Sequence, residues 1–230
     1  MKPWNTVIFD IDDTLYDQMV PFRKACEAVL GGKGLDAEAL YSARGKRGME
    51  ALQKVTDGLW TMEQNHIYRT KAGCADLGVA ISDEEALRFQ QVYAKAQQQL
   101  RISPIMAQVL DICTRENWNP GIITNGPADH QRKKFLTLRL DRWILPERVV
   151  VSGDCGFLKP AREIFDLAAE KFGLDPKKTL YVGDSYEHDI LGAADAGWNC
   201  YWLNRRDLPI PSDCPTPFVG SELAFLKFIS

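Results

Sequence analysis

The sequence contains no long apolar run, which argues against a membrane-spanning protein. No window approaches the ~20 apolar residues that a membrane helix needs. The N-terminal stretch MKPWNTVIFD also has no apolar segment long enough for a signal peptide. We therefore expect a cytoplasmic protein with no membrane partner.

Paired cysteine motifs are also missing. The six cysteines are scattered and form no C-x-x-C pair: Cys26, Cys74, Cys113, Cys155, Cys200 and Cys214. Without a secretory context such cysteines are read as reduced thiols that fill the core, and not as a disulfide framework or a zinc site.

A strong charge of either sign is absent. The net charge is -3, and the apolar and charged fractions of 45% and 26% are those of an ordinary globular protein. Such a chain has no field that would attract a nucleic-acid polymer. The short basic runs Arg132-Lys133-Lys134 and Arg205-Arg206 are interpreted as solvated faces.

Five short apolar runs are typical of buried parallel strands. They cover residues 6–10, 120–126, 148–154, 179–185 and 199–204 and are rich in Val, Ile and aromatic residues. Helical patterns lie between them, at 160–173 with Gly173 as a C-cap and at 189–197. The alternation predicts an α/β fold with a Rossmann-like parallel sheet.

The interval after the first strand breaks this alternation. It contains no convincing strand and has four helical patterns, at 19–32, 36–55, 61–78 and 83–100, the last two beginning at the capping residues Thr61 and Asp83. We predict a core formed by residues 1–16 and 103–230 and a helical-bundle domain of residues 17–102. The proline-rich stretch near the C-terminus is expected to be irregular before a short final helix.

Four carboxylates crowd the end of the first predicted strand. In VIFDIDDTLYD, residues 7–17, an apolar run leads into Asp10, Asp12, Asp13 and Asp17. Like charges this close raise one another's pKa unless a cation lies among them. Asp184 follows another predicted strand, and the carboxyl ends of parallel strands share one crevice. Oxygen ligands converging there favour Mg²⁺.

The same crevice is expected to hold a phosphate group. Thr124 offers a hydroxyl, and Asn125 and Gly126 are expected to expose backbone N–H groups at a strand-to-helix turn. Lys159 precedes a predicted helix and brings a positive charge. Asp10 is then placed as a nucleophile, and Asp12 as the acid that protonates the leaving oxygen and the base that activates water.

Four segments in order resemble the motifs of the haloacid dehalogenase-like hydrolases. They are DIDDT (10–14), IITN (122–125), LKP (158–160) and GDSYEHD (183–189), each at a strand end. The helical insert is similar to the cap of the subfamily that carries it after the first motif. The resemblance implies Mg²⁺, with four residues at the metal site: Asp10, Asp12 through its backbone carbonyl, Asp184 and Asp189.

The resemblance also bears on the substrate. Dehalogenases of the family lack the second aspartate, and this chain has Asp12, which favours phosphate chemistry. ITNG and GDSYEHDILGAADAG look most like a branch that includes pyrimidine 5′-nucleotidases. We therefore expect a Mg²⁺-dependent phosphatase of small phosphorylated metabolites, nucleotides first, that works through an aspartyl-phosphate as a monomer or homodimer.

Other readings stay open at this stage. The alternatives are a phosphomutase of the same fold, a phospho-accepting signalling domain, which also uses an Asp, a Thr or Ser, a Lys and Mg²⁺, and a catalytically inactive binding protein, which would usually lack a motif residue. A dehalogenase is the least favoured. Asp13 and Asp17 are expected to be structural. Asn125 either touches substrate or shapes its turn, and Tyr16 either faces the crevice or packs in the core.

Overall fold

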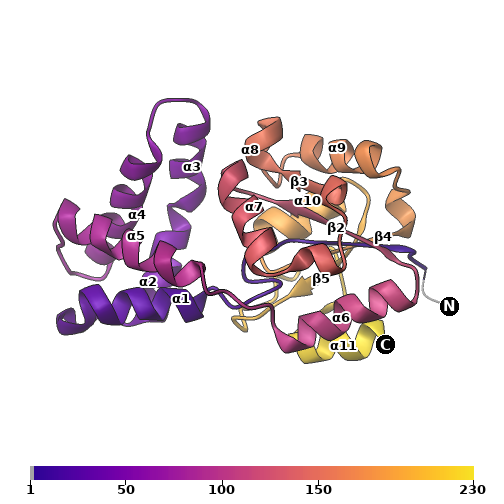
Figure 1. Cartoon of the computed structure of the whole chain (residues 1–230), viewed down its shortest axis with the longest axis horizontal. Coiled ribbons are helices and arrows are strands. Elements are labelled where there is room, and N and C mark those ends of the chain that lie inside the picture. The colour runs from indigo at the N-terminus through magenta and orange to yellow at the C-terminus, as the bar shows by residue number, and fades with distance from the viewer. Residues whose placement is uncertain (1–2) are drawn as a thin grey trace. The chain divides into compact units, whose positions relative to one another are not determined.

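The computed structural model describes residues 3–230, apart from the side chain of Met49. The chain divides into two compact units (Figure 1). One comprises the N-terminal residues to Asp17 together with Arg101–Ser230, and the other is Gln18–Leu100. We call them the core unit and the helical unit.

The core unit is built on one parallel sheet of six strands in the order β3-β2-β1-β4-β5-β6. This confirms the predicted α/β fold. The strands are β1 (Thr6–Phe9), β2 (Asn119–Thr124), β3 (Val149–Val151), β4 (Thr179–Gly183), β5 (Asn199–Leu203) and β6 (Val219–Gly220). The last one lies in the stretch expected to be irregular, where its two residues pair with β5.

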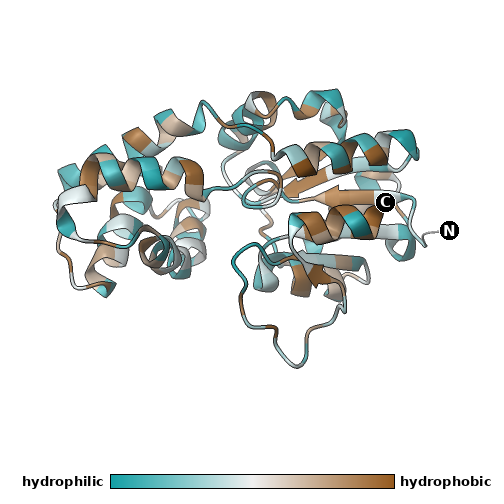
Figure 2. Ribbon diagram, turned by 90° about the horizontal axis from the view of Figure 1, so that it is seen from below, coloured by the Kyte–Doolittle hydropathy of each residue, from teal (hydrophilic) through white to brown (hydrophobic). Residues whose placement is uncertain are grey.

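Helices flank this sheet (Figure 2). They are α6 (Pro104–Arg115), α7 (Ala128–Thr137), α8 (Ser152–Cys155), α9 (Arg162–Phe172), α10 (Leu191–Asp195) and α11 (Glu222–Ile229). Short 3₁₀ turns lie at Leu140–Arg142, Pro146–Arg148 and Pro176–Lys178, and a π-helical turn at Tyr186–Ile190.

Helix α9 shows how the sequence pattern produces packing. Ile164, Phe165 and Ala168 are spaced to share one helical face, and all three are buried in one cluster with strand residues of the sheet. Gly173 ends the helix with a φ of 65°, a left-handed conformation that glycine adopts without steric cost.

Within the residues that the structure describes, the helical unit contains no strand. Its α-helices are α1 (Met19–Ala25), α2 (Ala37–Lys46), α3 (Gly48–Thr56), α4 (Met62–Asp76) and α5 (Asp83–Gln97), with a π-helical turn at Cys26–Leu30 and a 3₁₀ turn at Gly31–Lys33. Phe22, Phe89 and Tyr93 meet in its core with their rings edge to face or tilted.

Two details of the helical unit differ from the sequence prediction. The single helix expected over 36–55 is two helices, because the chain leaves helical geometry at Arg47, between Gly45 and Gly48, which weaken a helix. Helix α5 begins at Asp83, but the capping side chain is that of Ser82, which forms a reciprocal capping box with Glu85. Among the described residues no helix is both long and apolar enough to cross a bilayer.

Candidate active site

Three adjacent strands bring the predicted site residues to one edge of the sheet. β1 lies between β2 and β4. Asp10 follows β1, Thr124 ends β2, and Asp184 follows β4. Because the strands are parallel, their carboxyl ends coincide, so the side chains of Asp10 and Asp184 meet although they are far apart in the sequence.

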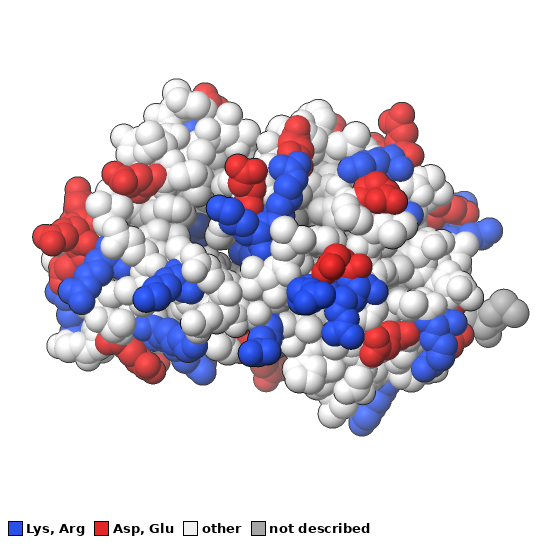
Figure 3. Space-filling view, in the orientation of Figure 1, with Lys and Arg blue, Asp and Glu red and all other residues white. Residues whose placement is uncertain are grey.

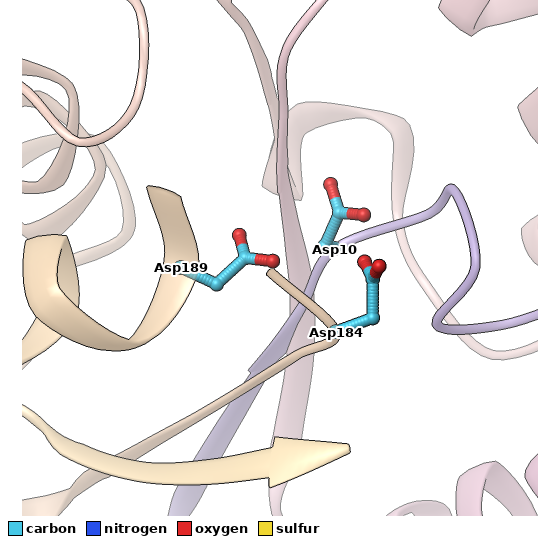
Figure 4. Close-up of side chains that lie close together, drawn as sticks. All are labelled: Asp10, Asp184 and Asp189. Carbon is cyan, nitrogen blue, oxygen red and sulfur yellow. The ribbon is translucent and has the colours of Figure 1, made fainter. Parts of the chain in front are cut away.

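A cluster of three carboxylates forms at this edge (Figure 4). Asp10, Asp184 and Asp189 point toward one another, each with an oxygen within 4.8 Å of an oxygen of the others. Burial, together with the charges of Asp189 and Asp12, raises the pKa of Asp10 to about 7 in spite of Lys159. Burial and the neighbouring Asp13 also raise the pKa of Asp184 well above its ordinary value. The raised pKa values show that the positive charge of Lys159 does not fully offset the negative charge of these carboxylates.

This shortage indicates what the cluster can hold. Its donors are carboxylate oxygens alone, with no sulfur or imidazole among them. Such a set suits a hard divalent cation such as Mg²⁺. The residues present therefore fit the metal that the sequence implied for Asp10, Asp184 and Asp189.

Lys159 supplies the positive charge inside the cluster. Its ammonium donates to Asp10 Oδ1 at 2.7 Å, to Asp189 Oδ1 at 2.6 Å and to the carbonyl of Ile123 at 3.2 Å. The hydroxyl of Tyr181 lies 3.0 Å away. With only 3% of its surface exposed, Lys159 is a fixed internal cation and not a solvated one.

Asp189 is held on both of its oxygens. Oδ1 accepts from Lys159 and from the hydroxyl of Tyr181, and Oδ2 accepts from the backbone N–H of Ser185 at 3.0 Å. Gly183 makes room for it, because a Cβ at that position would lie 2.3 Å from the carboxyl carbon of Asp189. Asp189 thus belongs to the site through Lys159 as well as through the carboxylate cluster.

Asp12 lies in a separate polar pocket of its own. The ammonium of Lys134 is 2.6 Å from each of its two oxygens, Gln131 Nε2 donates to Oδ2 at 2.9 Å, and the hydroxyl of Tyr16 donates to Oδ1. Burial opposes ionisation, but Lys134 and these hydrogen bonds outweigh it and lower the pKa of Asp12. Both roles considered for Tyr16 are therefore met: its ring is buried in the core and its hydroxyl contacts Asp12.

Lys134 and Gln131 were missed by the sequence analysis. Lys134 was assigned to a solvated basic run, which is wrong, since 6% of it is exposed. A usable signal existed: Gln131, Lys134, Phe135 and Leu138 follow the i, i+3, i+4, i+7 spacing of one helical face, and all four are buried. That face of α7 turns toward Asp12.

In the loop after β2, one of the three predicted phosphate-binding groups lacks a hydrogen-bond partner among the described residues, and the other two are already hydrogen-bonded within the protein. The Thr124 hydroxyl is fully buried and has no hydrogen-bond partner among the described residues. Asn125 exchanges two hydrogen bonds with the backbone of Lys159, at 2.9 and 3.0 Å, so its side chain shapes the loop. The Gly126 N–H donates to Ser152 Oγ at 2.9 Å, so the prediction that it is exposed to an anion is wrong.

The second basic run is also not a solvated face. Arg206 donates to Asp13 Oδ1 at 2.6 Å and to Asp17 Oδ1 at 2.8 Å, and Arg205 donates to the carbonyl of Asp13. Asp13 has a φ of 57°. These contacts fix the turn after β1 and agree with the structural role expected of Asp13 and Asp17.

Comparison with known proteins adds family evidence to this geometry. The sequence profile of the haloacid dehalogenase-like hydrolases matches residues 4–197. The chain is 29% identical to the pyrimidine 5′-nucleotidase YjjG of Escherichia coli, covering 97% of this chain and 96% of that one. It is 27% identical to the glyceraldehyde 3-phosphate phosphatase of Methanothermobacter thermautotrophicus, covering 87% and 85%.

Solved structures share the fold. The HAD-hydrolase YfnB of Bacillus subtilis, solved bound to magnesium, superposes with a TM-score of 0.73 at 19% identity and 100% coverage of both chains. The L-2-haloacid dehalogenase of Xanthobacter autotrophicus with covalently bound chloropropionic acid gives 0.71 at 16% identity and 98% coverage of both. At these identities the likeness concerns the fold alone.

The carboxylate cluster predicts stabilisation by a divalent cation. At about 100-fold excess over its Kd, MgCl₂ should raise the Tm by about 5 °C or more relative to NaCl of equal ionic strength, because the cation binds only the folded chain. Asp184→Asn should remove most of this rise, whereas Asp17→Asn, outside the cluster, should keep it. Equal rises in both variants, measured by differential scanning fluorimetry, would contradict the assignment.

The pocket around Asp12 predicts a second effect, on stability. Lys134→Met leaves a buried carboxylate without its cation and should lower the free energy of unfolding by about 2–3 kcal/mol. The matched change Lys133→Met, at the exposed neighbouring position, should alter it by less than about 0.5 kcal/mol. Urea denaturation measures both, and similar values for the two variants would refute the ion pair.

Proposed function

Because the chain belongs to the haloacid dehalogenase-like hydrolases, we propose that it is a Mg²⁺-dependent phosphatase of small phosphomonoesters. The observation that carries the proposal is the pair Asp10 and Asp12, two carboxylates in contrasting surroundings. The pKa of Asp10 is raised and that of Asp12 is lowered. Asp10 lies in the carboxylate cluster beside Lys159, where bound Mg²⁺ would favour its ionised, nucleophilic form, whereas Asp12 lies outside that cluster and pairs with Lys134; these separate surroundings support separate roles.

The first step transfers the phosphoryl group to the protein. A carboxylate oxygen of Asp10 attacks phosphorus, the bond from phosphorus to the ester oxygen breaks, and Asp12 gives that oxygen a proton as the alcohol leaves. Thr124 would donate its open hydroxyl to a phosphate oxygen, and Lys159 would offset negative charge. Bound Mg²⁺ would neutralise charge on the carboxylates and the transferring oxygens.

The second step returns the protein to its starting state. Asp12, now ionised, removes a proton from water, the hydroxide attacks phosphorus, and the bond to Asp10 breaks to release inorganic phosphate. Lys134 and Gln131 favour the ionised form of Asp12, which suits this step. The first step needs Asp12 protonated, so its pair with Lys134 has to loosen before the alcohol departs.

The relatives support a small substrate. One is named a pyrimidine 5′-nucleotidase and the other a glyceraldehyde 3-phosphate phosphatase, and nucleotides remain the first substrates to try. The helical unit would serve as a cap that excludes water and selects the leaving group, as the interdomain movement reported for YfnB suggests. We further propose a cytoplasmic monomer or homodimer.

A nucleic-acid polymer is not among the proposed partners. Basic and acidic side chains are intermixed over the face seen in Figure 3, without a broad basic patch. A phosphomutase of the same fold remains an alternative. It would show isomerisation of a sugar phosphate that depends on a bisphosphate, and no particular residue contact favours it.

The nucleophile is tested by phosphate release from a panel of phosphomonoesters, with and without Mg²⁺. The panel should include nucleoside monophosphates, sugar phosphates, phosphoglycolate, FMN and pyridoxal phosphate. Asp10→Asn should reduce kcat by about 10³-fold or more, because an amide cannot form the acyl phosphate. The control Asp17→Asn removes a carboxylate from the same loop and should stay within about threefold. No turnover from folded wild-type protein on any substrate would sink the proposal.

The acid/base role is tested with p-nitrophenyl phosphate, whose leaving group needs no proton. Asp12→Asn should release about one p-nitrophenolate per protein in a burst and then stall, because no base activates water. Mass spectrometry of the stalled protein should find one added phosphoryl group on Asp10. Steady turnover at the wild-type rate would exclude Asp12 from the mechanism. A long-lived acyl phosphate in the wild-type protein would instead support the signalling alternative.

A further inference from the structure

Two arginines of the helical unit differ from its surface cations. Arg47, Lys33 and Lys71 each pair with a carboxylate of the same unit, in partly exposed positions. Arg44 and Arg69 form no ion pair with any carboxylate in the part of the chain that the structure describes, and the Nε of each is buried without a hydrogen-bond partner. The two arginine charges are thus unpaired at buried positions, where an unpaired charge costs the most free energy.

Arg44 projects from α2 into the interior of the helical unit. Only 5% of it is exposed, and its guanidinium carbon lies 5.4 and 5.1 Å from the ring centres of Phe22 and Phe89. The rings attract the charge, but their faces do not replace the oxygen acceptors that five N–H donors require. The side chain is therefore stabilised as a cation and left short of hydrogen bonds.

The sequence makes space for both side chains with glycine. A Cβ at Gly73, inside α4, would lie 2.9 Å from Cγ of Arg44, and one at Gly48 would lie 3.1 Å from Nη2 of Arg69. Glycine inside a helix costs about 1 kcal/mol relative to alanine. The missing side chain at Gly73 therefore lets α4 approach the stem and the backbone of Arg44 on α2.

No carboxylate among the described residues offsets the charge of this arginine pair. Burial first, and then the like charge of Arg69, lower the pKa of Arg44 to about 10. Asn65 lies one helical turn before Arg69 on α4, is 1% exposed, and neither atom of its amide has a partner among the described residues. Arg69 is only partly buried, so a small solute can reach it from solvent.

We propose that Arg44 and Arg69 form a binding site for an oxyanion, meaning a phosphate or carboxylate group, within the helical unit. Such a group would pair with both guanidinium ions and accept their unused N–H donors, and the amide of Asn65 would complete the site. The oxyanion has two possible sources, a free anion or a second anionic group on a phosphorylated substrate. The second source rests on the proposed function.

Binding itself is tested on the full chain without reference to activity. Malonate, compared with NaCl at constant ionic strength, should raise the Tm of the wild-type protein by about 2 °C or more through preferential binding to the folded state. Arg69→Gln, at the accessible position, should lose most of this rise, as should Arg44→Met if it folds. Arg47→Gln is the matched control, because Arg47 already pairs with Asp76, and it should respond like the wild type.

The source is tested with two phosphomonoesters that differ in one anionic group. Arg69→Gln should raise the KM for 3-phosphoglycerate about tenfold or more and leave that for glycerol 3-phosphate unchanged if the substrate supplies the oxyanion. A lost malonate effect with no difference between the two esters assigns the site to a free anion. If neither ester is hydrolysed, the Tm measurement decides alone. Equal malonate responses in the wild type and Arg69→Gln would overturn the proposal.

Discussion

The ammonium of Lys159 is the interaction on which the carboxyl edge of the sheet depends. It binds Asp10 after β1, the carbonyl of Ile123 in β2 and Asp189 beyond β4, so one side chain joins three strands that the sequence keeps far apart. Asn125 fixes the backbone of Lys159 from both directions. Because the ammonium is buried, its charge is little screened, and the neighbouring carboxylates are positioned before any ligand arrives.

The charges at this edge divide into two groups with different consequences. When all three are ionised, Asp10, Asp184 and Asp189 face one ammonium, which leaves two negative charges, the amount that a divalent cation balances. Asp12, two residues from Asp10, already has its own cation in Lys134. In the proposed function, a bound metal would therefore neutralise the carboxylate of Asp10, while the side chain of Asp12 is already neutralised by Lys134. This separation lets two carboxylates so close in sequence titrate differently.

The sequence predicted structure well where a local pattern, such as an apolar run, determines a strand. It predicted poorly the contacts between side chains of two distant segments. Apolar runs that end in Asp10, Thr124 and Asp184 fixed the strands and their shared edge, because parallel strands leave few other arrangements. Lys134 and Arg206 were assigned to solvated basic runs because of the charged residues beside them in the sequence. Lys134 is buried because it lies on the inward face of α7, and Arg206 is partly buried because it pairs with Asp13 and Asp17 in a distant loop. The Gly126 N–H was expected to be open because its acceptor, Ser152, is remote in sequence.

Under the proposed function, the Asp12–Lys134 pair also sets a requirement on the reaction cycle. A carboxylate that accepts bonds from Lys134, Gln131 and Tyr16 is stabilised in its ionised form. In the proposed mechanism this ionised form suits the hydrolytic step, and substrate binding would have to supply the free energy that frees and protonates Asp12. A substrate that fills the site well enough to displace these contacts would then gain an acid catalyst. Water alone would not displace these contacts, so the rate of the proposed reaction would depend on recognition of the substrate.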